Sequence, residues 1–112
     1  MNGKDLMIDT NIIIYFLNGD KTIAELLRGK QLYISFITEL ELIGFKNLLR
    51  ECQIIKMSEQ IKHTYKTIRK NYPLKLADSI IVSTAMNLGL HLLSADKQLL
   101  KIKGLQLLIY TP

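Results

Sequence analysis

Short apolar runs alternate with longer amphipathic stretches along this chain. The runs have the length and composition of buried strands, and turn residues separate them from the stretches between. The expected strands cover residues 6–9, 31–35, 53–57, 90–94 and 105–110. The expected helices cover residues 11–19, 20–29, 38–52, 58–72, 76–89 and 95–104. This alternation predicts a three-layer α/β fold, with a central, mainly parallel sheet of about five strands flanked by helices.

Helix 58–72 has the clearest periodicity. Its apolar residues are spaced by four, three and four positions, which places them on one face; they are Ile61, Tyr65, Ile68 and Tyr72. The other faces are basic and carry Lys62, Lys66, Arg69 and Lys70. These basic residues either contact nucleic-acid phosphates or simply face solvent.

The start of helix 20–29 can be formed in two ways. Asp20 can cap the helix by accepting a hydrogen bond from a backbone N–H group. Alternatively, Thr22 and Glu25 fit the spacing of a capping box. The sequence leaves both alternatives open.

Carboxylates follow several of the predicted strands. Asp9 comes directly after the first strand, and Asp96 follows the fourth. Glu39 and Glu41 follow the second strand, in the expected first turn of the next helix. Asp78 lies early in a helix that must return antiparallel to the strands. Because the carboxyl ends of parallel strands share one edge, we expect acids from four separate segments to meet there.

Each acid also has a purely structural explanation. Asp9 and Asp96 can cap the helices that follow them, and Asp78 can complement a helix dipole. Thr38 and Glu41 fit another capping box. Taken together, however, carboxylates crowded at one edge repel each other unless a cation compensates their charge. Mg²⁺ and Mn²⁺ prefer oxygen ligands, so the sequence predicts a divalent metal at this edge.

Composition narrows the class of protein. The 112 residues are 48% hydrophobic, enough for one core, and we expect a single domain over residues 1–112. The net charge of +5 favours polyanion partners such as nucleic acid. Cys52 is the only cysteine, which excludes an internal disulfide. The MNGKD start lacks a secretory signal pattern and no apolar run could span a bilayer, so we expect a cytoplasmic protein without membrane association.

Four segments contain the motifs that are most specific. In chain order they are MIDTNIIIYFL, ISFITELELIG, ADSIIVSTAMNLGLHLLSAD and LQLLIY. Together they resemble the PIN-domain family, and within it the VapC-like toxin ribonucleases. The resemblance implies a PIN-like fold and a Mg²⁺- or Mn²⁺-dependent endoribonuclease, the toxin of a type II toxin–antitoxin (VapBC-like) system. It also implies RNA as substrate, a cognate antitoxin as partner and a homodimer.

The resemblance further implies which residues form the site. The four acidic positions of the family, as metal ligands and catalytic residues, fall on Asp9, Glu41, Asp78 and Asp96. Asn11 and Ser94 match the polar positions that hold water or support these ligands. Ser94 stands where threonine is more usual, and both offer a hydroxyl group. The segment between Gly44 and Asp78 is short for a VapC-like protein, which bears on the substrate groove and the dimer contacts.

Two other functions fit some of these features. A catalytically inactive PIN-like domain would act as a binding or assembly module, although the presence of all four acids argues against decay. A phosphoacceptor receiver domain also gathers acids at the edge of a parallel sheet. It needs an aspartate after the third strand, and the segment IIKMSEQ offers none.

Overall fold

A fully parallel sheet forms the centre of the protein. The computed structural model describes residues 4–112, so Met1, Asn2 and Gly3 of the MNGKD segment lie outside the described residues. The strands are β1 (Asp5–Ile8), β2 (Gln31–Ser35), β3 (Cys52–Ile55), β4 (His91–Ser94) and β5 (Leu107–Ile109). They lie in the order β3-β2-β1-β4-β5, and each neighbouring pair is parallel. The predicted α/β fold with a five-stranded, mainly parallel sheet is confirmed.

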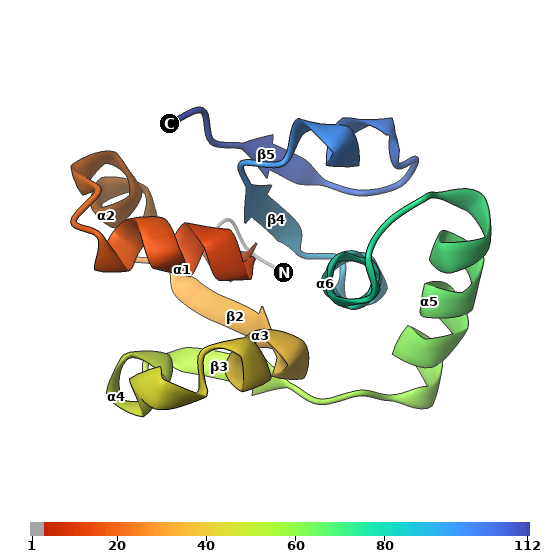
Figure 1. Cartoon of the computed structure of the whole chain (residues 1–112), viewed down its shortest axis with the longest axis horizontal. Coiled ribbons are helices and arrows are strands. Elements are labelled where there is room, and N and C mark those ends of the chain that lie inside the picture. The colour runs from red at the N-terminus through yellow and green to blue at the C-terminus, as the bar shows by residue number, and fades with distance from the viewer. Residues whose placement is uncertain (1–3) are drawn as a thin grey trace.

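Helices cover both faces of the sheet (Figure 1). One layer contains α1 (Thr10–Leu17), α2 (Lys21–Leu27) and α4 (Lys46–Leu49). The other contains α6 (Leu76–Leu88), with α5 (Glu59–Asn71) packed against it. Between the layers, α3 (Phe36–Glu41) contacts α6 and the strands β2 and β3. Two short 3₁₀ helices complete the chain, η1 (Ile43–Phe45) and η2 (Lys97–Lys101), and η2 replaces the helix predicted over residues 95–104.

Side-chain alternation along the strands builds a separate core on each face. In β1, Leu6 and Ile8 join the cluster that contains Ile12 of α1. Met7, between them, joins the opposite cluster with Val82 of α6. Because both faces are covered, successive residues of a central strand are all buried. This is why β1 appears in the sequence as a continuous apolar run.

The predicted apolar stripe of α5 faces the core. Ile61 and Ile68 are buried, and Tyr65 and Tyr72 are half-buried. Helix α6 is buried along most of its length, and it ends at Gly89, whose φ of 65° favours glycine. No helix among residues 4–112 combines the length and the apolar character that crossing a membrane requires.

The continuous helix predicted over residues 38–52 is wrong. The chain leaves the helical conformation at Leu42 (φ −118°, ψ 34°) and again at Phe45 (φ −114°, ψ 41°). Gly44 between them is a weak helix former, and the first break directs the side chain of Leu42 into the core. The apolar spacing of this segment fits a helix, so its periodicity did not reveal the breaks.

The first turn of α2 resolves the alternative that the sequence left open. The Asp20 carboxylate accepts a hydrogen bond from the Ile23 N–H group at 2.9 Å and caps the helix. The capping box of Thr22 and Glu25 is therefore wrong. Glu25 instead forms an exposed ion pair with Arg28, at 3.2 Å.

Candidate active site

The order of the strands creates a switch point between β1 and β4. The chain proceeds from β1 outward through β2 to β3, and then continues on the other side of β1 with β4 and β5. In parallel α/β sheets, ligands bind at the carboxyl ends of the strands that flank such a point. Asp9 follows β1 directly, and Asp96 lies two residues beyond the end of β4. Both acids therefore lie at the switch point.

Asp9 is held in one orientation by its surroundings. The residue is only 8% exposed, and its Oδ1 accepts a hydrogen bond from the Ile12 N–H group at 3.0 Å. Asp9 thus caps α1, as its structural explanation predicted, and Asn11 is exposed in the first turn of that helix. Burial raises the pKa of Asp9, and the negative charges of Asp78 and Asp96 raise it further. Hydrogen bonds from Ser94 and Ile12 act in the opposite direction.

Ser94 connects Asp9 with Asp96. It is the last residue of β4 and is fully buried. Its Oγ accepts a hydrogen bond from the Asp96 N–H group at 3.0 Å, and its side chain also hydrogen-bonds to Asp9. Asp96 Oδ1 accepts a hydrogen bond from the Gln98 N–H group at 2.9 Å, and Asp96 thereby caps the start of η2. The hydroxyl group at position 94 therefore lies between the two acids.

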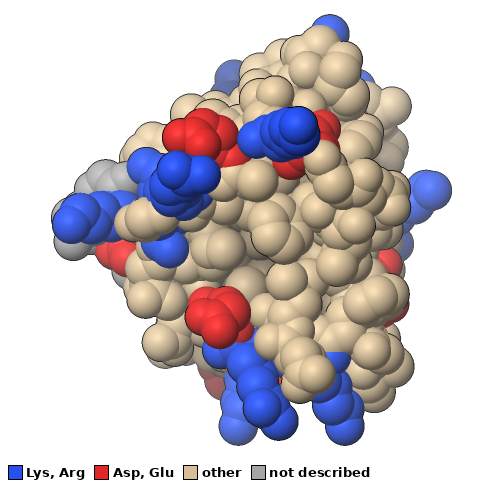
Figure 2. All heavy atoms as spheres, turned by 90° about the vertical axis from the view of Figure 1, so that its left-hand side faces the viewer, with Lys and Arg blue, Asp and Glu red and all other residues tan. Residues whose placement is uncertain are grey.

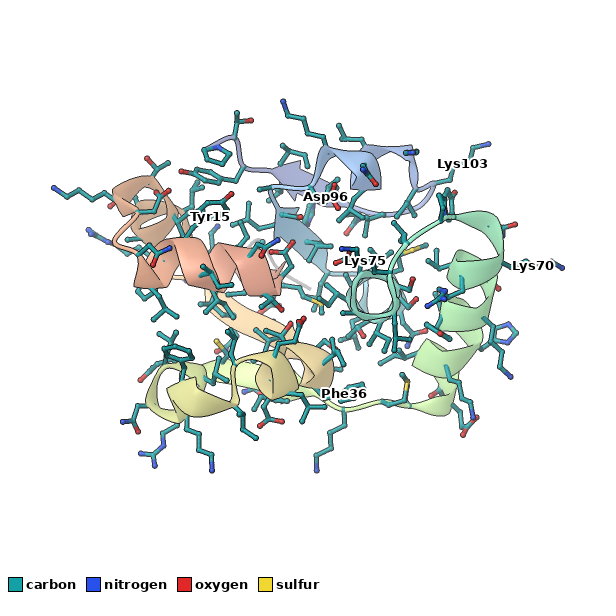
Figure 3. The ribbon with its side chains drawn as sticks, viewed as in Figure 1. Tyr15, Phe36, Lys70, Lys75, Asp96 and Lys103 are labelled. Atoms are coloured by element: carbon teal, nitrogen blue, oxygen red, sulfur yellow. The ribbon has the colours of Figure 1, made fainter. Side chains whose placement is uncertain are left out.

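Asp78 approaches from the other layer. It lies in the first turn of α6 and is half-buried. Burial raises the pKa of Asp78, and the charges of Asp96 and Glu41 add to this effect. The Lys75 ammonium group, three residues earlier, opposes it. Figure 3 shows Lys75 and Asp96 between α1 and α6.

Glu41 is the last residue of α3. This helix begins at Phe36 and is capped by Ser35, so the proposed capping box of Thr38 and Glu41 is wrong. The Oε1 atom of Glu41 accepts a hydrogen bond from the Thr10 hydroxyl group at 2.6 Å. Glu39, which does lie in the first turn, lines a separate surface cavity with Leu40, Ile43 and Arg50 among others. The two glutamates are therefore directed to different places.

The structure thus brings the four predicted acids into one electrostatic group. The charges of Asp78 and Asp96 act on Asp9, and the charges of Asp96 and Glu41 act on Asp78. Sequence analysis missed Thr10, which holds Glu41. Thr10 follows Asp9 in an otherwise apolar run, but its acceptor is 31 residues away, and nothing in the spacing indicates that pair.

The four acids offer the oxygen ligands that a hard divalent cation prefers. All four groups are carboxylates, and the mutual repulsion that raises the pKa of Asp78 is what a bound cation would relieve. Their side chains do not converge on one point: within residues 4–112, no three acidic, histidine or cysteine side chains are arranged to hold a metal ion.

A second notable surface lies on the layer of α1, α2 and α4. Figure 2 looks onto this side of the molecule and shows a broad area without charged side chains. An apolar cavity of about 300 Å³ opens here, lined by residues that include Ile13, Phe16, Leu27 and Leu48. Ile14 and Leu17 are also exposed on α1.

Comparisons with known proteins identify the family of this chain. A protein-family model described as the PIN domain matches residues 45–105. This range contains Asp78, Ser94 and Asp96, while Asp9 and Glu41 precede it. A comparison with curated proteins gave no match.

Solved structures with the same fold cover nearly the whole chain. A toxin–antitoxin complex from Klebsiella pneumoniae is 31% identical, with a TM-score of 0.79 over 89% of this chain and 94% of that one. VapBC-1 from nontypeable Haemophilus influenzae is 27% identical, with a TM-score of 0.77 over 96% and 99%. VapBC2 from Rickettsia felis, bound to a promoter DNA fragment, is 24% identical, with a TM-score of 0.81 over 95% and 98%, and supports the fold alone.

Proposed function

The chain belongs to the PIN-domain family, and on this basis we propose that it is a nuclease, specifically a divalent-metal-dependent endoribonuclease. We further propose that it is the toxin of a VapBC-like toxin–antitoxin pair. The similarity to the Klebsiella pneumoniae toxin–antitoxin complex, at 31% identity over most of both chains, supports the toxin assignment.

One observation carries the proposed activity. Acids from four separate segments, Asp9, Glu41, Asp78 and Asp96, form one electrostatic group at the carboxyl edge of the sheet. Helix capping suits Asp9 and Asp96, and a place in the first turn of α6 suits Asp78, but these local explanations do not require the acids to gather at one edge. Such a group lowers the stability of the folded protein, because like charges that are partly desolvated repel each other.

Each residue has a defined task in the proposed reaction. Asp9, Glu41 and Asp78 would hold a Mg²⁺ or Mn²⁺ ion, and Asp96 would complete the site. A bound divalent ion supplies Lewis acidity, which acidifies a water molecule and neutralises charge on a phosphate. The Ser94 hydroxyl group keeps the Asp9 carboxylate oriented, and Asn11 is placed to hold water at the rim. Burial, with the charges of neighbouring acids, raises the pKa of Asp9 and of Asp78, which favours a proton on each of these groups relative to an ordinary aspartate.

The basic residues suit a polyanionic substrate. Four carboxylates alone would repel an RNA phosphate, so nearby positive charge is needed at the site. Lys75 lies close enough to affect Asp78, and Lys97 follows Asp96 directly. The basic face of α5 would extend this positive surface along the RNA backbone.

Two protein partners complete the proposal. A cognate antitoxin would cover the apolar area on α1, α2 and α4, because an apolar cavity opens there beside exposed Ile14, Phe16 and Leu17. A second copy of the chain would form a homodimer. Exposed Leu40, Ile43 and Phe45, on α3 and η1, are candidates for that contact.

Cleavage of RNA tests the proposed activity. The wild-type protein and Asp9→Asn are incubated with an RNA pool in Mg²⁺, in Mn²⁺ and in a chelator. We expect cleavage that requires the metal, that Asp9→Asn reduces by at least about a hundredfold, and that the control Glu39→Gln retains. Absent or metal-independent cleavage would instead favour an inactive PIN-like binding module.

A further inference from the structure

We propose that the Thr10 hydroxyl group is a positioning group, which sets the direction of the Glu41 carboxylate relative to Asp9 and Asp78. The inference rests on the proposed metal-dependent function and specifies how this chain orders one of its ligands. Thr10 itself touches neither substrate nor metal in this proposal and acts through Glu41.

The contact itself is short and joins two elements. Thr10 is the first residue of α1 and follows Asp9 directly, while Glu41 ends α3. A distance of 2.6 Å separates Thr10 Oγ1 from Glu41 Oε1. Hydroxyl-to-carboxylate hydrogen bonds of this length are charge-assisted and about twice as strong as neutral ones. The bond therefore fixes α3 against the start of the helix that Asp9 caps.

A second hydroxyl group keeps Thr10 in place. Thr38 is completely buried, and its Oγ1 lies 3.2 Å from Thr10 Oγ1. A threonine hydroxyl has one hydrogen to donate, and a carboxylate is a better acceptor than another hydroxyl group. Thr10 therefore donates to Glu41, and its own oxygen is free to accept from Thr38. Because Thr38 precedes Glu41 by one helical turn, Thr10 contacts a single face of α3.

The bond reduces the freedom of a side chain that is otherwise mobile. Glu41 is exposed, and fixing a free glutamate side chain costs rotamer entropy. Threonine is branched at Cβ, so its hydroxyl direction is itself restricted. Because Oε1 accepts the hydrogen bond from Thr10, Oε2 and the second lone pair of Oε1 remain for a cation. Preordering of this kind raises the affinity of a site.

Two substitutions at position 10 separate the hydroxyl group from the shape of the side chain. Thr10→Val keeps the shape and removes the hydroxyl group, whereas Thr10→Ser keeps the hydroxyl group. Titration calorimetry of the full chain with Mn²⁺ measures affinity directly, without any reaction. We expect Thr10→Val to weaken Mn²⁺ binding about 10- to 100-fold, the usual effect of losing a group that orients a ligand. Thr10→Ser should stay within about threefold of wild type.

Two controls and one substitute variant complete the experiment. Thr22→Val makes the same change at an exposed threonine of α2 and should leave Mn²⁺ affinity unchanged. In a Glu41→Gln background, Thr10→Val should cause little further loss, because its effect passes through Glu41. If Thr10→Val does not fold, Thr10→Ala is judged by the same criteria.

The outcomes distinguish this inference from the proposed function. Wild-type affinity in Thr10→Val overturns the positioning role and leaves the nuclease intact. An equal loss in Thr10→Ser and Thr10→Val also overturns it, because the hydroxyl group would then not be the cause. If the wild-type protein neither binds Mn²⁺ nor cleaves RNA, the proposed function fails and the positioning role fails with it.

Discussion

The hydroxyl group of Tyr110 donates a hydrogen bond to the Asp20 carboxylate, although 90 positions separate the two residues. Asp20 is also the N-cap of α2. The Tyr110 ring packs edge-on against Tyr15 of α1, with 5.7 Å between the ring centroids. One side chain after β5 thus holds both helices that begin the chain, and it keeps α1 in place beside the candidate site.

Tyr110→Phe should make the protein less sensitive to acid. The Tyr110 hydrogen bond lowers the pKa of Asp20 below its ordinary value of 3.8. A carboxyl group with a lowered pKa in the folded state adds stability above the unfolded pKa, and this stability is lost as the pH falls through the folded value. We expect Tyr110→Phe to be less stable than wild type at neutral pH, with a smaller difference near pH 3. Urea unfolding at both pH values measures this, and equal differences would contradict it.

Asp78→Asn should stabilise the protein at neutral pH, whereas Tyr110→Phe should destabilise it. The pKa of Asp78 is raised above 3.8 by burial and by Asp96 and Glu41, with Lys75 opposing. Its ionised form therefore destabilises the folded protein, and stability falls as the pH rises from 3.8 through the folded pKa. We expect Asp78→Asn to raise the free energy of unfolding of the metal-free protein at neutral pH. Below the unfolded pKa the difference should disappear.

Thermal unfolding in a chelator, at neutral and at acid pH, measures the effect of Asp78→Asn. The control is Glu39→Gln, which removes a carboxylate that lines a different cavity. A lower melting temperature of Asp78→Asn at neutral pH would show that the charge of Asp78 contributes to stability, and would contradict the electrostatic argument.

Mn²⁺ should stabilise the folded protein. A ligand at one hundred times its dissociation constant adds about 2.7 kcal/mol to the free energy of unfolding. For a domain of this size that corresponds to roughly 10 °C in melting temperature. Asp9→Asn keeps the helix cap, since asparagine is also a good N-cap, but removes the charge. We expect the metal to leave the melting temperature of Asp9→Asn nearly unchanged. An equal shift in this variant would mean that the ion binds elsewhere.

Ile12→Ala tests the packing that supports the site. Ile12 is fully buried between α1 and the sheet, so truncation should cost about 2–5 kcal/mol of unfolding free energy. Ile14, two positions along the same helix, is 40% exposed. The matched change Ile14→Ala should cost less than about 1 kcal/mol. Denaturant unfolding of the two variants compares them, and similar losses would contradict the placement of α1.

The placement of the acids could be predicted because it depends only on strand direction. Asp9 and Asp96 follow strands, and Asp78 begins a returning helix, so parallel order alone brings them to one edge. The Thr10 contact with Glu41 could not be predicted in this way. It depends on the side-chain directions of two helices that meet only in the folded protein, and the expected start of α3 was displaced by two residues.

The break after α3 illustrates the same limit. Leu42 and Phe45 fit helical spacing, and a single glycine between them is tolerated in many helices. At the break, the Leu42 side chain is buried in the core, a tertiary contact that local spacing does not reveal. Local patterns therefore predicted the order of the elements better than the ends of this segment.

The strand order has a consequence for synthesis of the chain. β1 pairs with β4, which is synthesised much later. The carboxyl edge that carries the acids is therefore incomplete until the ribosome has added Asp96. Until then Asp9 has no Ser94 beside it, and the fourth acid does not yet exist. The four acids of the proposed nuclease therefore exist together only after the chain has been synthesised through Asp96, the last of them.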